Sequence, residues 1–269
     1  MPALIDAGSD GGAVAALKAN TRDWHRQLDR QSLLSVLVSP ALTPDIYREV
    51  LCRLLPIHQR IEAALCPYLE NAPRAEFAVI DRALWHRSGD LVADILSLHG
   101  EPGSCPGAEA AAARPAPDLL LHDVTEAWGC LYVIGGASLG GQIIARRVLA
   151  QLGAGAARSL QFFHGRSVDA GVAWRALCSS LESALHEPRG RLAAIAKAQE
   201  TFAYYAGCLD RSGPMSVPDL LDCGAGTVTR GLHAVPETSG SRHCYSAALL
   251  GVPGDAGARP GLARRGRDP

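Results

Sequence analysis

The chain has 269 residues, of which 48% are hydrophobic and 20% are charged, as is typical of a globular protein with a substantial core. A formal net charge of −1 at pH 7 gives no general case for nucleic acid or an anionic membrane as a partner. Helix-forming residues abound while β-branched and aromatic residues are sparse, so the composition predicts an all-α protein.

The cysteines give a prediction about the cellular compartment. Eight of them are scattered along the chain without a C-x-x-C pair, a pattern that fits neither a zinc site nor a small disulfide scaffold. The first residues also lack the basic segment and apolar core of a signal peptide. We therefore expect reduced thiols in a cytoplasmic protein.

The N-terminal half of the chain contains two well-marked helices. Residues 1–12 are predicted to be a disordered leader, and a first helix follows over about 13–31. The Thr-Pro-Asp sequence at 43–45 has the pattern of an N-cap, an N1 proline and a first-turn acid. It predicts a long helix that ends near residue 69 and bends at Pro56.

The next segments alternate between helix and loop. Apolar spacing predicts a helix over 75–98, and the Gly, Pro and Ala content of 100–117 predicts a loop. A helix is expected to begin at Asp118 and to continue, bent at its glycines, to about residue 152. Two further helices are expected over 168–186 and 189–210.

The C-terminal segment differs in character from the rest. From about residue 211 the chain is dense in Gly, Pro, Ser and Arg and lacks sustained periodicity, which predicts disorder over 212–269. The folded helical domain is accordingly predicted to comprise residues 13–211.

The most informative segment is the uncharged stretch 128–145, which is apolar over a full helix length but contains four glycines: Gly135, Gly136, Gly140 and Gly141. Each glycine inside a helix costs about 1 kcal/mol relative to alanine. Either another helix packs closely here, or a flat ligand lies against bare backbone. The stretch is at the short end of the membrane-spanning range and contains Ser138 and Gln142, so we expect a buried helix rather than a membrane span.

The first predicted helix carries Lys18, Arg22, His25 and Asp29 at spacings that place them on one face. The two cations lie roughly 10 Å and 4.5 Å along the helix axis from the histidine. Haem offers an iron that takes neutral imidazole and two propionates that need cations, and Asp29 is placed to orient the imidazole. The alternative is the ordinary exposed face of a surface helix.

Four segments together resemble the haem oxygenase family: TRDWHRQLDRQSLL, TPDIYREVL, GCLYVIGGASLGGQIIARRV and LQFFHG. The similarity covers about residues 17–209, in the family's order and spacing, and looks closest to the bacterial biliverdin-producing enzymes that often accompany phytochromes. It implies a single-domain haem oxygenase-like helical bundle with a bent, glycine-rich distal helix.

The resemblance also implies roles for individual residues. His25 matches the proximal histidine that ligates the haem iron, the site's metal. Cofactor-binding positions near the propionates are matched by Lys18, Arg22 and Arg175. The distal helix, whose backbone lies over the haem face and takes part in catalysis, is matched by Gly136, Gly140 and Gly141.

Two positions depart from the family pattern. Bacterial relatives commonly have glutamate where this chain has Gly135. Mammalian-type enzymes have an aspartate that holds a distal water network where this chain has Ala137. Haem binding is expected to survive both changes, whereas the efficiency and regiochemistry of oxygen activation are less secure.

The implied activity is oxidative cleavage of haem to biliverdin, CO and free iron. It uses O2 and electrons from an external reductase or ferredoxin, with haem as both substrate and cofactor. A bacterial phytochrome is a candidate biliverdin acceptor, and neither nucleic acid nor membrane is expected as a partner.

Three alternatives remain open. The first is a non-catalytic haem-binding or sensor protein, for which Gly135 and Ala137 leave room. The second is an enzyme of the related helical fold that cleaves thiamin-like compounds, with Cys130 as its nucleophile, although this cysteine fits better as a small packing residue. The third is a structural helical protein.

Overall fold

A computed structural model describes residues 11–70, 77, 80–98, 118–165 and 170–211. These residues form helices and connecting turns and include no strand, so the all-α prediction is confirmed. Most of the predicted leader and the whole of the predicted loop and tail, 100–117 and 212–269, lie outside the described residues.

The α-helices, in chain order, are α1 (Ala13–Asp29), α2 (Ser32–Ser35), α3 (Pro44–Leu69), α4 (Ser88–Ser97), α6 (Val124–Leu152), α7 (Gln161–His164), α8 (Ala170–Ala184) and α9 (Pro188–Arg211). Short 3-10 turns occur at η1 (Val36–Val38), η3 (Arg82–Leu84) and η4 (Ala154–Ser159). The predicted helices over 13–31, 168–186 and 189–210 correspond to α1, α8 and α9.

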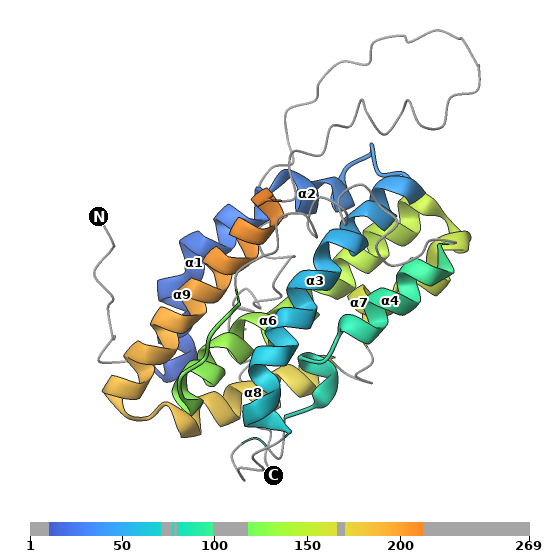
Figure 1. The fold of residues 1–269 in the computed structure, drawn as a ribbon. Coiled ribbons are helices and arrows are strands. Elements are labelled where there is room, and N and C mark those ends of the chain that lie inside the picture. The colour runs from blue at the N-terminus through green and yellow to red at the C-terminus, as the bar shows by residue number, and fades with distance from the viewer. Residues whose placement is uncertain (1–10, 71–76, 78–79, 99–117, 166–169, 212–269) are drawn as a thin grey trace, which may run out of the picture.

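Helix α6 lies at the centre of the bundle (Figure 1). It packs against α9, α8, α7 and α3, while α1 lies alongside α9. By length and composition α6 could cross a membrane, but 78% of its most apolar window is buried inside the bundle. This burial is what a core helix shows, in agreement with the expectation from the sequence.

Helix α3 begins as predicted. The hydroxyl of Thr43 accepts a hydrogen bond from the backbone N–H of Ile46 at 3.2 Å, and Pro44 occupies the first helical position. The helix continues through Pro56 as far as Leu69.

The prediction that α6 begins at Asp118 is wrong. The carboxylate of Asp123 accepts from the backbone N–H of Glu126 at 2.9 Å, and that of Glu126 accepts from the N–H of His122, also at 2.9 Å. With Asp123 as its N-cap, the helix begins at Val124. Asp118 instead pairs with Arg60 at 2.6 Å.

A single helix over 75–98 is also wrong, because only η3 and α4 form there among the described residues. The carboxylate of Glu62, on α3, accepts hydrogen bonds from the backbone N–H groups of Arg87 and Ser88, each at 2.6 Å. A residue far away in the sequence thus caps α4, and apolar periodicity carries no information about such a contact.

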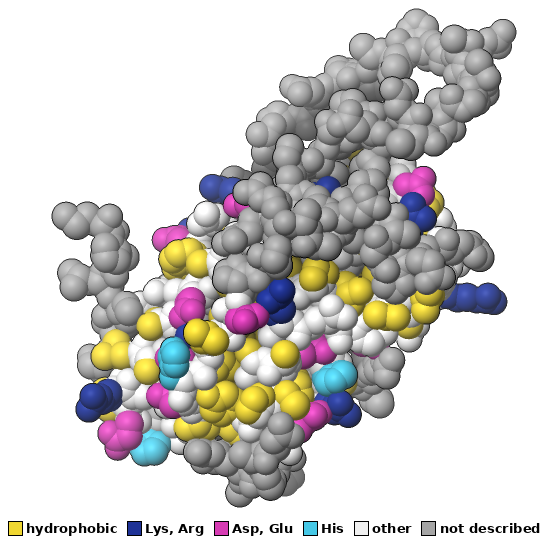
Figure 2. All heavy atoms as spheres, viewed as in Figure 1, with side chains coloured by type: hydrophobic (Ala, Val, Ile, Leu, Met, Phe, Trp, Pro, Cys, Tyr) yellow, Lys and Arg dark blue, Asp and Glu magenta, His cyan; other side chains and the backbone are white. Residues whose placement is uncertain are grey.

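The expectation of reduced thiols holds only in part. Cys130 and Cys178 are free thiols, whereas Cys52 is disulfide-bonded. On the face shown in Figure 2, acidic and basic side chains are interspersed over the coloured surface, as the small net charge leads one to expect.

Candidate functional site

The first component of the site is the imidazole of His25 on α1. Its Nδ1 lies 3.0 Å from a carboxylate oxygen of Asp29, one helical turn further on, and its ring lies beside that of Phe202 on α9, with 6.2 Å between centroids. An ionised carboxylate only accepts, so in the neutral imidazole the proton lies on Nδ1 and the lone pair on Nε2. This Nε2 is buried and has no hydrogen-bond partner among the described residues.

An unpartnered buried nitrogen is unfavourable by about 1–3 kcal/mol, so an occupant that accepts its lone pair is the natural explanation. A neutral imidazole oriented through its other nitrogen is the usual form of a metal-ligating histidine. The residues present therefore fit a haem iron at this position.

The predicted propionate-binding cations lie on two neighbouring helices. Lys18 and Arg22 lie on α1 with exposed side chains, and Arg175 is exposed on α8, which packs against α1. An exposed cation stays hydrated and keeps its rotamer freedom until an anion binds. Such a side chain is suited to bind a carboxylate at the rim of a pocket. Their role toward haem remains a prediction.

The predicted distal glycines all lie on α6, and Gly136, Gly140 and Gly141 are buried. Their catalytic role also remains a prediction. For Gly141 the structure shows that helix packing also requires a glycine. A Cβ there would lie 2.6 Å from the carbonyl oxygen of Phe163, so this glycine lets α7 approach α6 closely.

The two departures from the family pattern differ in their surroundings. Gly135 faces Leu177 of α8, and a Cβ at this position would overlap the end of that leucine side chain, so a larger residue here requires the leucine to move. Ala137 lines a cavity instead.

This cavity lies on the inner side of α6. It is bounded by residues from α1, α2, α3, α6, α7 and α9 together with Arg87, and it has a volume of about 60 Å³. That volume accommodates water molecules or a diatomic gas, not a porphyrin. Leu28, one turn after His25, and Ala137 both line it, so it reaches from α1 to the glycine-rich segment.

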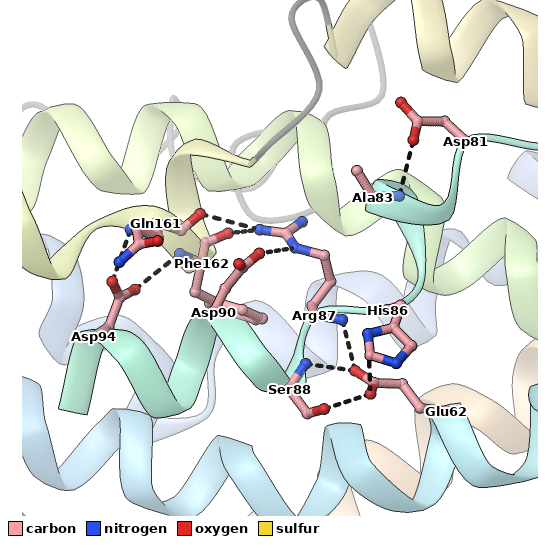
Figure 3. Close-up of polar contacts among 10 residues, drawn as sticks. All are labelled: Glu62, Asp81, Ala83, His86, Arg87, Ser88, Asp90, Asp94, Gln161 and Phe162. Carbon is pink, nitrogen blue, oxygen red and sulfur yellow. Dashed lines mark hydrogen bonds and ion pairs between the residues drawn. The ribbon is translucent and has the colours of Figure 1, made fainter. Parts of the chain in front are cut away.

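Arg87 forms one wall of the cavity, and a network of ionised groups fixes it in place (Figure 3). Its guanidinium bonds the carboxylate of Asp90 at 3.1 Å and the carbonyl oxygen of Phe162, and it lies over the Phe162 ring at 5.1 Å from the centroid. Because Arg87 contacts this carbonyl, this carboxylate and the aromatic face together, it also restricts the position of the Phe162 ring.

Asp94 completes this support. Its two carboxylate oxygens accept from the backbone N–H groups of Gln161 and Phe162 at 2.9 and 2.8 Å and so anchor the start of α7 (Figure 3). Burial raises the pKa of Asp94 to about 6, although these two hydrogen bonds oppose the shift. Glu62, Arg87, Asp90 and Asp94 together hold α4 and α7 in fixed relation.

The sequence prediction did not include these four residues. A signal was available for Asp90 and Asp94, because these acids alternate with the apolar Leu91 and Ile95 on a short helix and therefore had to be buried with partners. The identity of the partners was not accessible, since Gln161 and Phe162 lie about seventy residues further along the chain.

Cys130 is not suited to be a nucleophile. It is fully buried, and burial raises the pKa of its thiol to about 12. Because the thiolate is the reactive form, the thiamin-cleaving alternative loses its only named nucleophile. The cysteine packs as a small apolar residue, which was the favoured interpretation of the sequence.

Three solved structures share the fold. The haem oxygenase of Leptospira interrogans is 16% identical, with a TM-score of 0.56 over 74% of this chain and 98% of that one. The NO- and CO-bound haem oxygenase of Neisseria meningitidis is 20% identical, with a TM-score of 0.54 over 76% and 94%. Haem oxygenase-1 of the cyanobacterium Synechocystis, in complex with haem, is 14% identical, with a TM-score of 0.57 over 79% and 96%. At these identities the likeness concerns the fold alone.

Sequence comparison supplies the family. A haem oxygenase of Xanthomonas campestris pv. campestris is 42% identical over 82 residues, which are 30% of this chain, and the match spans about half (48%) of that relative's length. The family model described as heme oxygenase matches residues 12–211, which include α1 through α9. The chain belongs to the haem oxygenase family.

Proposed function

We propose that this protein is a haem oxygenase that opens haem to biliverdin, CO and free iron, using O2 and electrons from an external donor. Family membership supports the reaction class. The observation that carries the proposal is the buried Nε2 of His25, which has no partner in the described part of the chain and is oriented by Asp29.

Haem, when bound, supplies the iron at which dioxygen is activated and is itself the molecule oxidised. His25 holds it through Nε2, and Asp29 keeps the imidazole in the tautomer that leaves this nitrogen free. Lys18, Arg22 and Arg175 bind the propionates and so set the rotation of the porphyrin. The bare backbone of α6 at Gly136 and Gly140 admits a close approach to the ring.

Haem titration tests the proposal. Added haemin should give the wild-type protein a Soret band, and His25→Ala should abolish the histidine-ligated spectrum and turnover. His164→Ala is the matched control, since His164 is exposed on α7. Ascorbate or a ferredoxin system is then added and biliverdin is followed by absorbance. An unchanged Soret band and full activity in His25→Ala would remove this residue from the site.

The assay also separates turnover from binding alone. A wild-type protein that binds haem but forms no biliverdin with either reductant would be a haem-binding protein without turnover. Double substitution of Lys18 and Arg22 by alanine should weaken haem affinity, and the loss should shrink at high salt because exposed charges are screened.

The finer assignments rest on the sequence resemblance. It supports a reductase or ferredoxin as electron donor, the phytochrome-associated branch, a bacterial phytochrome as biliverdin acceptor, and a cytoplasmic location. Transfer of newly formed biliverdin to a purified apophytochrome, followed by the appearance of its red absorbance, tests the acceptor. Free diffusion of the product without transfer would contradict it.

A further inference from the structure

The cavity beside α6 contains a histidine with no assigned role. His58 lies on α3, is 2% exposed and lines the cavity. Its ring packs edge-on against Phe162 and Tyr205, with centroids 4.8 and 5.7 Å away. Its Nε2 shares a hydrogen bond with the Tyr205 hydroxyl, and its Nδ1 has no hydrogen-bond partner among the described residues.

The charge state of His58 is fixed by its surroundings. Burial, aided by the nearby positive charge of Arg87, lowers its pKa to about 3. The imidazole is therefore neutral at any physiological pH, and one nitrogen carries a proton while the other accepts.

The hydrogen bond to Tyr205 selects the tautomer. If the tyrosine hydroxyl donates to Nε2, the hydroxyl hydrogen and the Nε2 lone pair are both satisfied, and Nδ1 carries the imidazole proton. If Nε2–H donated instead, the Tyr205 proton would itself need an acceptor in a buried site. The first arrangement is favoured, and it leaves Nδ1–H as a donor beside the cavity.

Other polar groups of the cavity are already engaged. The hydroxyl of Ser138 donates to the carbonyl oxygen of Gly135 at 2.7 Å, and Arg87 is held by Asp90 and the Phe162 carbonyl. Ala137, which also lines the cavity, has no polar side-chain atom. An unsatisfied buried donor is unfavourable, and a cavity of about 60 Å³ exceeds the 10–15 Å³ that one water requires on the same measure.

We propose that His58, held by Tyr205, donates a hydrogen bond from Nδ1 to a water molecule in this cavity and fixes that water beside Ala137 on α6. The lone pair on the Ser138 hydroxyl is a second polar contact for the same water. His58 is thus a positioning residue, and Tyr205 sets its tautomer. Its part in turnover rests on the proposed haem chemistry, whereas the tautomer and the water do not.

The first test uses the apoprotein labelled with 15N in its histidine rings. Besides the His25 ring, whose Nδ1–H faces Asp29, long-range 1H–15N spectra should show a second ring in the Nδ1–H form, and this second ring should not titrate between about pH 5 and pH 8, since its pKa is far below this range. His58→Gln should remove that resonance, and His164→Gln should leave it. Tyr205→Phe should mix the two tautomers. A pure Nε2–H form in the wild type would overturn the proposal.

The second test looks for the water itself. A nuclear Overhauser contact between a long-lived water and the His58 ring should appear in the wild type and vanish in His58→Gln. Its absence from the wild type would also overturn the proposal.

The third test is turnover with haem bound. Both His58→Gln and Tyr205→Phe should lower biliverdin formation by roughly ten- to a hundredfold with unchanged haem affinity, since a misplaced reacting group costs rates of this order. Unchanged turnover in both variants would refute the part of His58 in turnover. Failure of the wild type to bind haem would refute the proposed function, while the first two tests would still decide the role of His58.

Discussion

Replacing Gly141 by alanine tests whether packing alone requires glycine on α6. The added Cβ would lie 2.6 Å from the carbonyl oxygen of Phe163, a backbone atom that cannot rotate aside. Reaching the 3.4 Å of ordinary contact requires α6 and α7 to separate by about 0.8 Å, in an interior that is close-packed.

The magnitude follows from two opposing effects. Overpacking of this kind costs about 1–3 kcal/mol, and removing a glycine from a helix interior returns up to about 1 kcal/mol. We expect Gly141→Ala to lower the unfolding free energy by about 1–2 kcal/mol and the melting temperature by roughly 2–8 °C.

Thermal melting of the apoprotein followed by circular dichroism is the assay. Gly207→Ala is the matched control, because Gly207 lies inside α9 with no atom within 4 Å of the added Cβ, so its melting temperature should stay or rise. If Gly141→Ala melts at or above the wild type, the packing argument is refuted. A drop in haem affinity with unchanged melting would then assign Gly141 to the ligand instead.

Three further predictions concern buried polar groups. Because burial raises the pKa of Asp94 to about 6, the folded protein binds its proton more tightly than the unfolded chain. The contribution of this group to the unfolding free energy therefore decreases as the pH rises from about 4 to about 6 and is constant above pH 6. The unfolding free energy of Asp94→Asn, measured with urea, should lack this decrease. Cys130, with a pKa of about 12, should resist iodoacetamide in the native protein at about pH 8 and react after denaturation, and native labelling would contradict its burial. Arg87→Lys should lower the unfolding free energy by about 1–3 kcal/mol, since lysine lacks the planar fork whose two separate nitrogens reach Asp90 and the Phe162 carbonyl, whereas Arg26→Lys at an exposed pair should change little.

The sequence predicted the elements that local signals define. The Thr-Pro-Asp start of α3 was recognisable because the Thr43 hydroxyl and the Ile46 N–H that donates to it are only three residues apart. The starts of α4 and α6 were missed for two different reasons. Glu62 caps α4 from another helix, whereas the true cap of α6 at Asp123 competed with an equally acceptable acid at 118.

The candidate site divides in the same way. His25 and Asp29 are one helical turn apart, so their hydrogen bond follows from spacing, and the structure contains it. His58 and Tyr205 are 147 residues apart and meet only because α3 and α9 pack together. No periodicity of either helix encodes that pairing, so it could be found only in the folded protein.

The proposed positioning role of His58 depends on the same packing that makes Gly141 a glycine. Because Gly141 lets the backbone at Phe163 come close to α6, the preceding Phe162 ring reaches the edge of the His58 imidazole. Arg87 and Asp94 then fix Phe162 through its carbonyl and its N–H. A side chain at 141 would therefore shift the wall that holds the histidine, as well as destabilise the bundle. It follows that Gly141→Ala should shift the ring resonances of His58 even in the absence of haem, whereas Gly207→Ala should not.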